Sequence, residues 1–301
     1  MSVYTYRRIM RGIYAAIKYP SYIPVYLKYV WNDIASTVGI YKYPHHVIFI
    51  VGLPKSGTTW LYNILMELPG FNRRFNQLSK TVNADGILKT DWFNLPEDTF
   101  LTAPKRGYSI YREHSAYNKH NLKIITKYMD KLIFIYRDIR DVCISLYFHF
   151  KNDETSDGYH IVKNLSEEEG IDYTMQVIKD DFVPWIQAWM NAEELSTGKI
   201  LQIKYENLWD NTRNELERIV NFYGFNVSES FYKTALKSKI KSTQNLRESL
   251  FKNSFSLKLS TARRGGSGGW KKYLSQKQKE QFKDFAGQLL INLNYEHDLD
   301  W

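Results

Sequence analysis

The sequence predicts a three-layer α/β fold with a central, mostly parallel sheet flanked by helices. Continuous apolar, β-branched runs such as Val47–Val51 and Leu132–Tyr136 are typical of strands buried on both faces of a parallel sheet. Each run is followed by apolar residues at helical spacing, so strands and helices alternate along the chain. With 301 residues, 44% of them apolar, we expect one large packed domain.

The composition narrows the function without choosing it. A net charge of +9 indicates an anionic partner, which could be nucleic acid, an acidic membrane surface or a highly charged small molecule. The single cysteine, Cys143, excludes an intrachain disulfide and a cysteine metal cluster, and its apolar helical surroundings place it in the core. The chain has no apolar run of ~18 residues and no secretory signal at its start, so a cytoplasmic location is expected.

Residues 1–44 form a predicted extension ahead of a domain at 45–301. The extension is rich in Tyr, Lys and Arg, and Pro20 and Pro24 divide it into two expected short helices. Basic residues mixed with aromatic ones suit a peripheral membrane contact. The alternative is a pair of helices packed on the domain with a solvated basic face.

The first strand of the domain is predicted to end in an anion-binding loop. Gly52 and Gly57 supply turn residues, and Thr58 and Thr59 are expected to cap the next helix. The loop amides and the helix N-terminus would direct positive charge at one point. The spacing from Gly52 to Gly57 matches the start of the P-loop pattern, but Thr58 replaces the required lysine, and the loop's lysine is Lys55. The loop alone fits a plain glycine turn equally well.

Two further strands are predicted to end in chemically useful residues. Tyr108–Arg112 is followed by His114, whose ordinary pKa suits a general base at the carboxyl end of a strand. Leu132–Tyr136 is followed by Arg137 and by a helix that carries Ser145, and both side chains could face one anion.

The second half of the chain completes the predicted sheet and its covering helices. Residues 151–170 are polar and acidic, which indicates a surface excursion. Arg263, Arg264 and Gly265 open a glycine run that suits the wrapping of a phosphate, or a basic linker. The other predicted elements are a helix over Tyr173–Leu195 kinked at Pro184, a strand at Ile200–Tyr205, a helix that ends at Gly224 and a closing helix at about Ser275–Leu293.

Together these segments resemble the sulfotransferases that use 3′-phosphoadenosine-5′-phosphosulfate, a family with a P-loop-type fold. Pro54–Trp60 (PKSGTTW) is similar to the family's phosphosulfate loop. Arg137–Phe150 is similar to its R-N-P-x-D-V-x-x-S-x-x-x-x-F signature, with Asp138 and Ile139 for Asn-Pro. Arg263–Lys271 is similar to R-K-G-x-x-G-D-W-K, with arginine for the family's lysine and glycine for its aspartate.

The resemblance also covers the candidate base. Arg112-Glu113-His114 stands where the cytosolic sulfotransferases carry Lys-Thr-His, so Arg112 keeps the positive charge while Glu113 is new. Glu113 is interpreted either as structural or as a partner of the imidazole. Asp141 is interpreted as a brace of helix or loop.

The resemblance implies a role for each site residue. His114 would take the acceptor's proton, and Lys55 would neutralise charge on the leaving oxygen. The product would be 3′,5′-adenosine bisphosphate, and no metal would be needed. The implied donor-binding residues are Lys55, Ser56, Gly57, Thr58 and Thr59 at the 5′-phosphate, Trp60 and Tyr205 at adenine, and Arg137, Ser145, Arg263, Arg264 and Gly265 at the 3′-phosphate.

The acceptor is not determined by the sequence. In this family the irregular stretch 70–105 contributes to the acceptor pocket, so Trp92, Phe93 and Phe100 are candidates for lining it, although ordinary packing explains them too. A small molecule, a lipid or a carbohydrate would each suit the composition, whereas nucleic acid is not expected. The oligomeric state is not determined either.

Two other functions remain open. An ATP-dependent P-loop phosphotransferase would require Mg²⁺ and would leave the arginines of the 3′-phosphate motifs unexplained. A non-enzymatic, basic membrane- or nucleic-acid-binding protein would use the charge without chemistry, and its binding would survive Lys55→Ala. The order of the three motifs favours the sulfotransferase.

Overall fold

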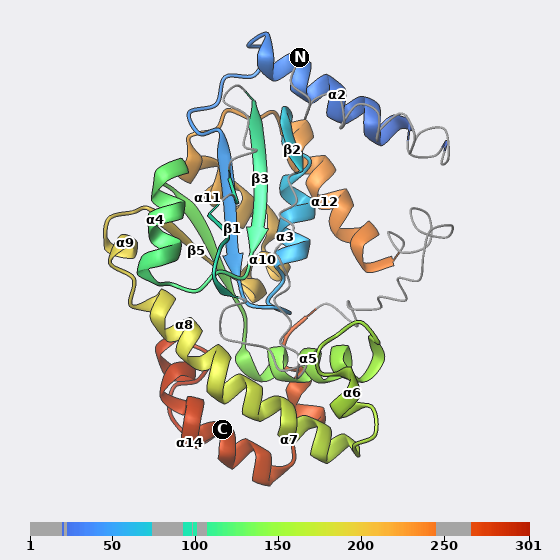
Figure 1. The fold of residues 1–301 in the computed structure, drawn as a ribbon, viewed down its shortest axis with the longest axis vertical. Coiled ribbons are helices and arrows are strands. Elements are labelled where there is room, and N and C mark those ends of the chain that lie inside the picture. The colour runs from blue at the N-terminus through green and yellow to red at the C-terminus, as the bar shows by residue number, and fades with distance from the viewer. Residues whose placement is uncertain (1–19, 21–22, 74–92, 98, 101–106, 245–265) are drawn as a thin grey trace.

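The computed structural model describes residues 20, 23–73, 93–97, 99–100, 107–244 and 266–301 (Figure 1). Its centre is a parallel sheet of five strands in the order β2-β3-β1-β4-β5. The strands are β1 (Val47–Gly52), β2 (Phe71–Arg73), β3 (Tyr108–Glu113), β4 (Leu132–Tyr136) and β5 (Ile200–Lys204). The α-helices are α2 (Ile23–Thr37), α3 (Thr58–Leu65), α4 (Lys119–Tyr128), α5 (Ile139–Asn152), α6 (Tyr159–Val162), α7 (Glu167–Val177), α8 (Val183–Met190), α9 (Glu193–Ser196), α10 (Tyr205–Asp210), α11 (Thr212–Tyr223), α12 (Glu229–Gln244) and α14 (Gln276–Asn292). A π-helical turn, η3 (Ile178–Phe182), joins α7 to α8, and a 3₁₀ turn, η4 (Gly269–Lys272), precedes α14.

The register of the sheet aligns the strand ends that carry the predicted site. Val51 of β1 pairs with Glu113 of β3, and Gly52 pairs with Ile135 of β4. β4 in turn pairs with β5 up to Tyr136 and Lys204. Since all these strands are parallel, their carboxyl ends lie at one edge of the sheet, where the following loops converge.

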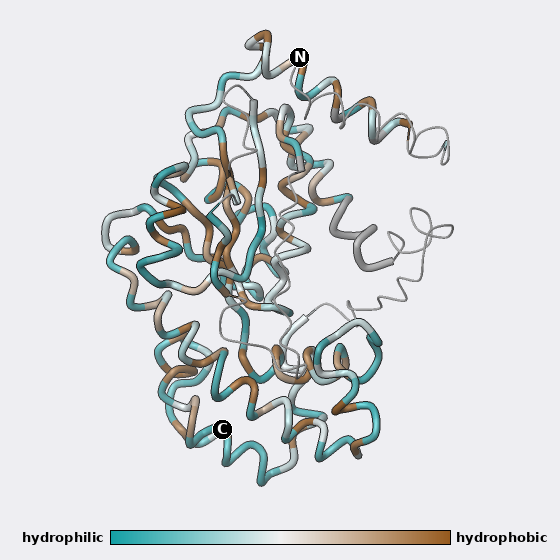
Figure 2. Tube along the Cα trace, in the orientation of Figure 1, coloured by the Kyte–Doolittle hydropathy of each residue, from teal (hydrophilic) through white to brown (hydrophobic). Residues whose placement is uncertain are grey.

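Two hydrophobic cores lie on opposite faces of the sheet. Phe49 and Ile50 are both completely buried, but they belong to different cores because successive strand side chains point to opposite faces. One core includes α4, α5, α7, α8 and α14, and the other includes α3, α10, α11 and α12. Figure 2 shows hydrophobic residues concentrated along the central strands. The predicted three-layer α/β fold is confirmed, and Cys143 is fully buried as expected.

Residues 151–170 lie mostly at the surface, as expected, but they include helical segments that were not predicted. This stretch contains α6 and the start of α7, which begins with a capping box in which Ser166 accepts a hydrogen bond from the amide of Glu169 and Glu169 accepts one from the amide of Ser166. The Ser-x-x-Glu pattern is a helix start signal that outweighs the acidic composition. The long helix expected over 173–195 consists of α7, η3 and α8, with the irregular turn lying just before Pro184.

The remaining predicted elements agree with the structure to within one residue. α11 ends at Gly224, whose positive φ of 63° closes the helix. Of the two helices expected before residue 45, α2 is described, with Pro24 as its second residue, and residues 1–19 lie outside the described part. Among the described helices none is long and apolar enough to cross a bilayer.

Candidate active site

The loop between β1 and α3 is a tight turn with two residues at positive φ. Lys55 has φ 70° and Gly57 has φ 89°. The hydroxyl of Ser56 donates to the carbonyl of Leu53 at 2.5 Å, which closes the turn. A Cβ on Gly57 would lie 2.4 Å from the Tyr205 ring, so only glycine lets the loop pass this close to the ring.

The helix after the loop begins differently from the prediction. Gly57, and not Thr58 or Thr59, is the N-cap, and the two threonines are the first helical residues. Thr58 is buried and Thr59 is exposed. Because glycine has no side chain to cap the first turn, the N-terminus of α3 keeps the arrangement of amides that attracts anions.

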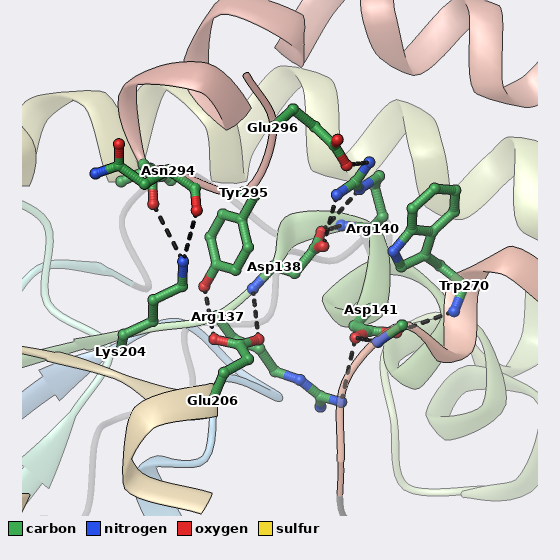
Figure 3. Close-up of polar contacts among 12 residues, drawn as sticks. Arg137, Asp138, Arg140, Asp141, Lys204, Glu206, Trp270, Asn294, Tyr295 and Glu296 are labelled. Carbon is green, nitrogen blue, oxygen red and sulfur yellow. Dashed lines mark hydrogen bonds and ion pairs between the residues drawn. The ribbon is translucent and has the colours of Figure 1, made fainter. Parts of the chain in front are cut away.

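Arg137, directly after β4, connects three parts of the site. Its guanidinium donates to the carbonyl of Lys55 at 3.3 Å and to the carbonyl of Gly266 at 3.0 Å. It also lies 4.5 Å from the centroid of the Tyr205 ring. Arg137 is thus fixed between the β1–α3 loop and the glycine run, as Figure 3 shows for its position beside Asp141.

The Tyr205 ring beside Arg137 belongs to a cluster of three aromatic rings. Trp60 of α3 lies 5.7 Å from Tyr205 and 5.3 Å from Trp209 of α10, measured between ring centroids. Such a cluster offers faces on which a purine base can stack. The sequence analysis missed Trp209, although its place four residues after Tyr205 puts both on one side of α10.

The predicted brace, Asp141, holds the glycine run. Its carboxylate accepts hydrogen bonds from the amides of Gly268 at 2.7 Å and Trp270 at 3.0 Å (Figure 3). The guanidinium of Arg137 lies 3.9 Å away. Burial raises the pKa of Asp141, while Arg137 and the two amides oppose that rise. Arg263, Arg264 and Gly265 themselves lie outside the described residues.

A buried ionic network lies behind Arg137, and the sequence analysis missed it. Asp138 caps α5 and accepts two hydrogen bonds from the Arg140 guanidinium, at 3.0 and 2.8 Å. Arg140 also pairs with Glu296 at 2.6 Å (Figure 3). Its guanidinium lies 3.9 Å from the centroid of the Trp270 ring and 4.2 Å from that of Trp301. Asp138 and Ile139 stand where the family motif has Asn-Pro. The replacement of Asn by Asp138 therefore supplies the carboxylate that pairs with Arg140.

The candidate base, His114, lies just beyond β3. Its Nδ1 is hydrogen-bonded to the carbonyl of Gly52. Since a carbonyl only accepts, Nδ1 carries the proton and the lone pair is on Nε2. Burial, and next the charge of Arg112, lower the pKa of His114 to about 4. Arg112 donates to the hydroxyl of Thr59, and Glu113 is buried.

A second histidine, His149 of α5, lies close to the loop lysine and was not predicted. Burial is the main cause that lowers the pKa of His149, and the charge of Lys55 is the next. Its Nδ1 is 3.4 Å from the carboxylate of Asp153. Ser145, one turn earlier on α5, is half-buried.

The residues considered for the acceptor pocket are mostly core residues. Phe100 is completely buried, with its centroid 5.0 Å from the Tyr111 ring, and Phe93 packs against Trp185 at 6.4 Å. Trp92 lies outside the described residues. For the two phenylalanines the packing interpretation is the one that agrees with the structure. Within the described ranges, no group of three or more His, Cys, Asp or Glu is placed to hold a metal ion.

Comparisons with known proteins agree on one family. The family model described as "Sulfotransferase domain" matches residues 45–294. Sulfotransferase 2A1 of Macaca fascicularis is 26% identical over 257 residues, covering 82% of this chain and 85% of that protein. The amine sulfotransferase of Oryctolagus cuniculus is 25% identical and covers 83% of this chain and 85% of that protein. The crystal structure of mouse sulfotransferase SULT7A1 complexed with PAP has a TM-score of 0.61 at 16% identity and covers 86% of this chain and 90% of that one, which is a likeness of fold.

Proposed function

Because the chain belongs to the sulfotransferase domain family, we propose that it transfers a sulfuryl group from 3′-phosphoadenosine-5′-phosphosulfate to a hydroxyl or amine of a small-molecule acceptor. The enzyme class rests on the family match and on curated relatives that bear the name sulfotransferase. The donor site and the roles of individual residues are inferred from the chemistry of the side chains at the carboxyl edge of the sheet.

The position of Arg137 carries the donor assignment. One guanidinium contacts the Lys55 loop, the glycine run at Gly266 and the Tyr205 ring, so three separate segments meet around one fixed positive charge. Such a guanidinium suits a phosphate that lies beside an adenine. Ser145 and the arginines Arg263 and Arg264 would complete the 3′-phosphate site.

The β1–α3 loop suits the other end of the donor. Its positive φ values at Lys55 and Gly57 and the N-terminus of α3 support binding of the 5′-phosphate by the loop amides with Thr58 and Thr59. The donor supplies a sulfuryl group that is already activated by its phosphate leaving group. Lys55 would stabilise the negative charge that develops on the departing oxygen. Trp60 and Tyr205, which meet edge to face, would form the aromatic surface that contacts the adenine.

His114 is proposed as the general base. Its Nδ1–H is committed to the Gly52 carbonyl, so Nε2 is the basic atom, and burial keeps the ring neutral. A neutral imidazole can take the acceptor's proton as the acceptor oxygen or nitrogen attacks sulfur. Glu113 is proposed as structural because its side chain is buried at the end of β3.

The acceptor is proposed to be a small molecule with a hydroxyl or an amine. Relatives with names such as amine sulfotransferase and 3-alpha-hydroxysteroid sulfotransferase support this class. We propose that the reaction needs no metal ion, since Lys55 and Arg137 supply positive charge to balance the donor's phosphates.

Calorimetric binding of 3′,5′-adenosine bisphosphate and of ADP, both in EDTA, tests the donor site directly. We expect the bisphosphate to bind more tightly, and Arg137→Ala to weaken its binding by about 1.5 to 3 kcal/mol, the scale of a hydrogen bond to a charged group. Arg213→Ala is the matched control because Arg213 is a surface arginine paired with Glu229. Equal binding of the two nucleotides, or no effect of Arg137→Ala, would contradict the proposal.

A further inference from the structure

Helix α2 exposes a set of large apolar side chains. Eight large hydrophobic side chains are exposed in the described part of the chain, and six of them lie between residues 23 and 40. Figure 2 shows the corresponding hydrophobic segments on this helix. We define the α2 stripe as Ile23, Leu27, Trp31, Ile34 and Val38.

The α2 stripe is a continuous surface. At ~100° per residue, its members fall within an arc of about 80°, so they form one row along the helix. Val38 continues the helical path, because its amide donates to the carbonyl of Ile34 at 2.9 Å. The exposed fractions range from 41% at Ile23 to 67% at Val38. A row of this kind is a surface that a partner can cover.

The buried side of α2 carries Asn32, Ala35 and Ser36 and attaches the helix to the domain. Asn32 donates to the carbonyl of Phe71 at 3.0 Å and accepts from the amide of Gly70 at 3.3 Å. Ser36 donates to the carbonyl of Gly70 at 3.1 Å. Both side chains are buried. The helix is therefore held by polar contacts at the start of β2, which leaves its apolar row outward.

The charges around the helix favour an anionic partner. The 22 residues that lead into α2 contain Arg7, Arg8, Arg11 and Lys18 and no acidic residue. Lys42, shortly after the helix, is exposed. A row of apolar side chains with a tryptophan, next to a basic segment, is the pattern of helices that lie in the interface of an anionic membrane.

The size of the α2 stripe argues against a second copy of the chain as its partner. Five side chains on one helix fall well short of the about 20 to 30 residues that each side of a standard protein interface contributes. A bilayer surface needs no matching pocket, and a single row can enter its interfacial region.

We propose that the α2 stripe binds the surface of an anionic lipid bilayer and attaches the enzyme to it peripherally. The stripe lies at the end of the sheet where the strands begin, whereas α5 and the site lie at the other end (Figure 1). Membrane attachment is therefore separate from donor binding.

Sedimentation of the full chain with lipid vesicles tests this proposal. Vesicles of phosphatidylcholine with about one-third phosphatidylserine provide the anionic surface, and pure phosphatidylcholine provides the neutral one. We expect the wild type to bind the anionic vesicles and Leu27→Ser/Ile34→Ser to bind at least about tenfold more weakly. The matched control is Ile161→Ser/Leu299→Ser, since these side chains are 48% and 49% exposed, close to the 58% and 51% of Leu27 and Ile34.

A separate variant tests how much the basic residues before α2 contribute to vesicle binding. Arg7→Gln/Arg8→Gln/Arg11→Gln should weaken binding to anionic vesicles and make it less sensitive to salt. Calorimetric binding of 3′,5′-adenosine bisphosphate should be unchanged in every variant, which shows that each is folded. Wild type that fails to bind anionic vesicles, or stripe and control variants that bind equally, would overturn the proposal.

A fluorescent label on the α2 stripe distinguishes contact with lipid from contact with residues 1–22 or with a second copy of the chain. The single native cysteine, Cys143, is fully buried, so an environment-sensitive dye can be attached selectively to Val38→Cys, with Ile161→Cys as the control. Only the dye at position 38 should report an apolar environment when anionic vesicles are added. An apolar signal before vesicles are added would overturn the proposal, because it would mean that residues 1–22 or a second copy of the chain cover the α2 stripe. Sedimentation velocity would then distinguish a monomer from a dimer.

Discussion

The neutral imidazole of His114 determines the expected pH dependence of the reaction. Burial and the charge of Arg112 lower its pKa to about 4, below the ordinary value near 6.5. A base acts in its deprotonated form, so kcat/KM should stay level as the pH falls through 6.5 and should decline only near pH 4. A pH profile of kcat/KM measures this, and a decline centred near 6.5 would contradict the environment described for the ring.

The proposed base role has a separate control. His114→Ala should lower kcat by about 10² to 10⁴, the range for loss of a general base. Binding of 3′,5′-adenosine bisphosphate should not change, because the proposed role of His114 is to take the acceptor's proton and not to bind the nucleotide. A variant that loses nucleotide binding to the same extent would indicate a structural role instead.

Gly57 is the residue at which backbone conformation and site geometry coincide. Gly57→Ala adds a Cβ at φ 89° and 2.4 Å from the Tyr205 ring, whereas Gly198→Ala adds one at φ 69° with nothing within 4 Å. Both variants should lose about 1 to 2 kcal/mol of unfolding free energy from the left-handed backbone. Only Gly57→Ala should also weaken calorimetric binding of 3′,5′-adenosine bisphosphate, by at least about tenfold, because the loop or the ring must move. Equal binding in both variants would contradict this account.

The start of α5 depends on the pairing of Asp138 with Arg140. Arg140 is 2% exposed, so removing the carboxylate leaves a buried guanidinium whose one remaining ion pair among the described residues is with Glu296. Asp138→Ala should therefore lower the free energy of unfolding by about 3 kcal/mol, as urea denaturation would measure. Glu229→Ala, which breaks an exposed pair with Arg213, should have no measurable effect. Similar losses of unfolding free energy in the two variants would show that the buried pair contributes no more to stability than the exposed one.

The network also connects distant elements to the proposed donor site. Arg140 joins α5 to η4 through Trp270 and to the C-terminal segment through Glu296 and Trp301. Asp141 binds two amides of the glycine run from the next position on α5. One helix start therefore sets the position of Arg137 and of the glycine run together.

Across the whole molecule, donor-site binding should stabilise the fold. The proposed site joins the β1–α3 loop, α5, α10 and the glycine run, so a bound nucleotide would link elements from both faces of the sheet. At a concentration of 3′,5′-adenosine bisphosphate about 100 times its Kd, the gain is about 2.7 kcal/mol and should appear as a higher Tm. EDTA should leave this shift unchanged. A shift that appears only with Mg²⁺ would favour the phosphotransferase alternative.

Much of the fold could be predicted from local patterns. β1 and β4 were identified because strands buried on both faces need continuous apolar runs, whatever their neighbours are. Lys55 and Arg137 were identified because each lies in a short segment next to a strand end, and parallel strands bring such ends together. The start of α7 was missed because its acidic composition was weighed above its capping box, and threonine was expected at the N-cap of α3, where the structure has Gly57.

The sequence by itself determined the order of the strands along the chain, the loops that carry charge and the family they resemble. Only the tertiary structure decided the partners: Arg137 with the carbonyl of Gly266, 129 positions away, and Arg140 with Glu296. It also decided that α2 attaches by Asn32 and Ser36 and turns its apolar row outward. Hydrophobic periodicity shows that one side of an element is apolar, but which side is covered depends on packing against residues far along the chain.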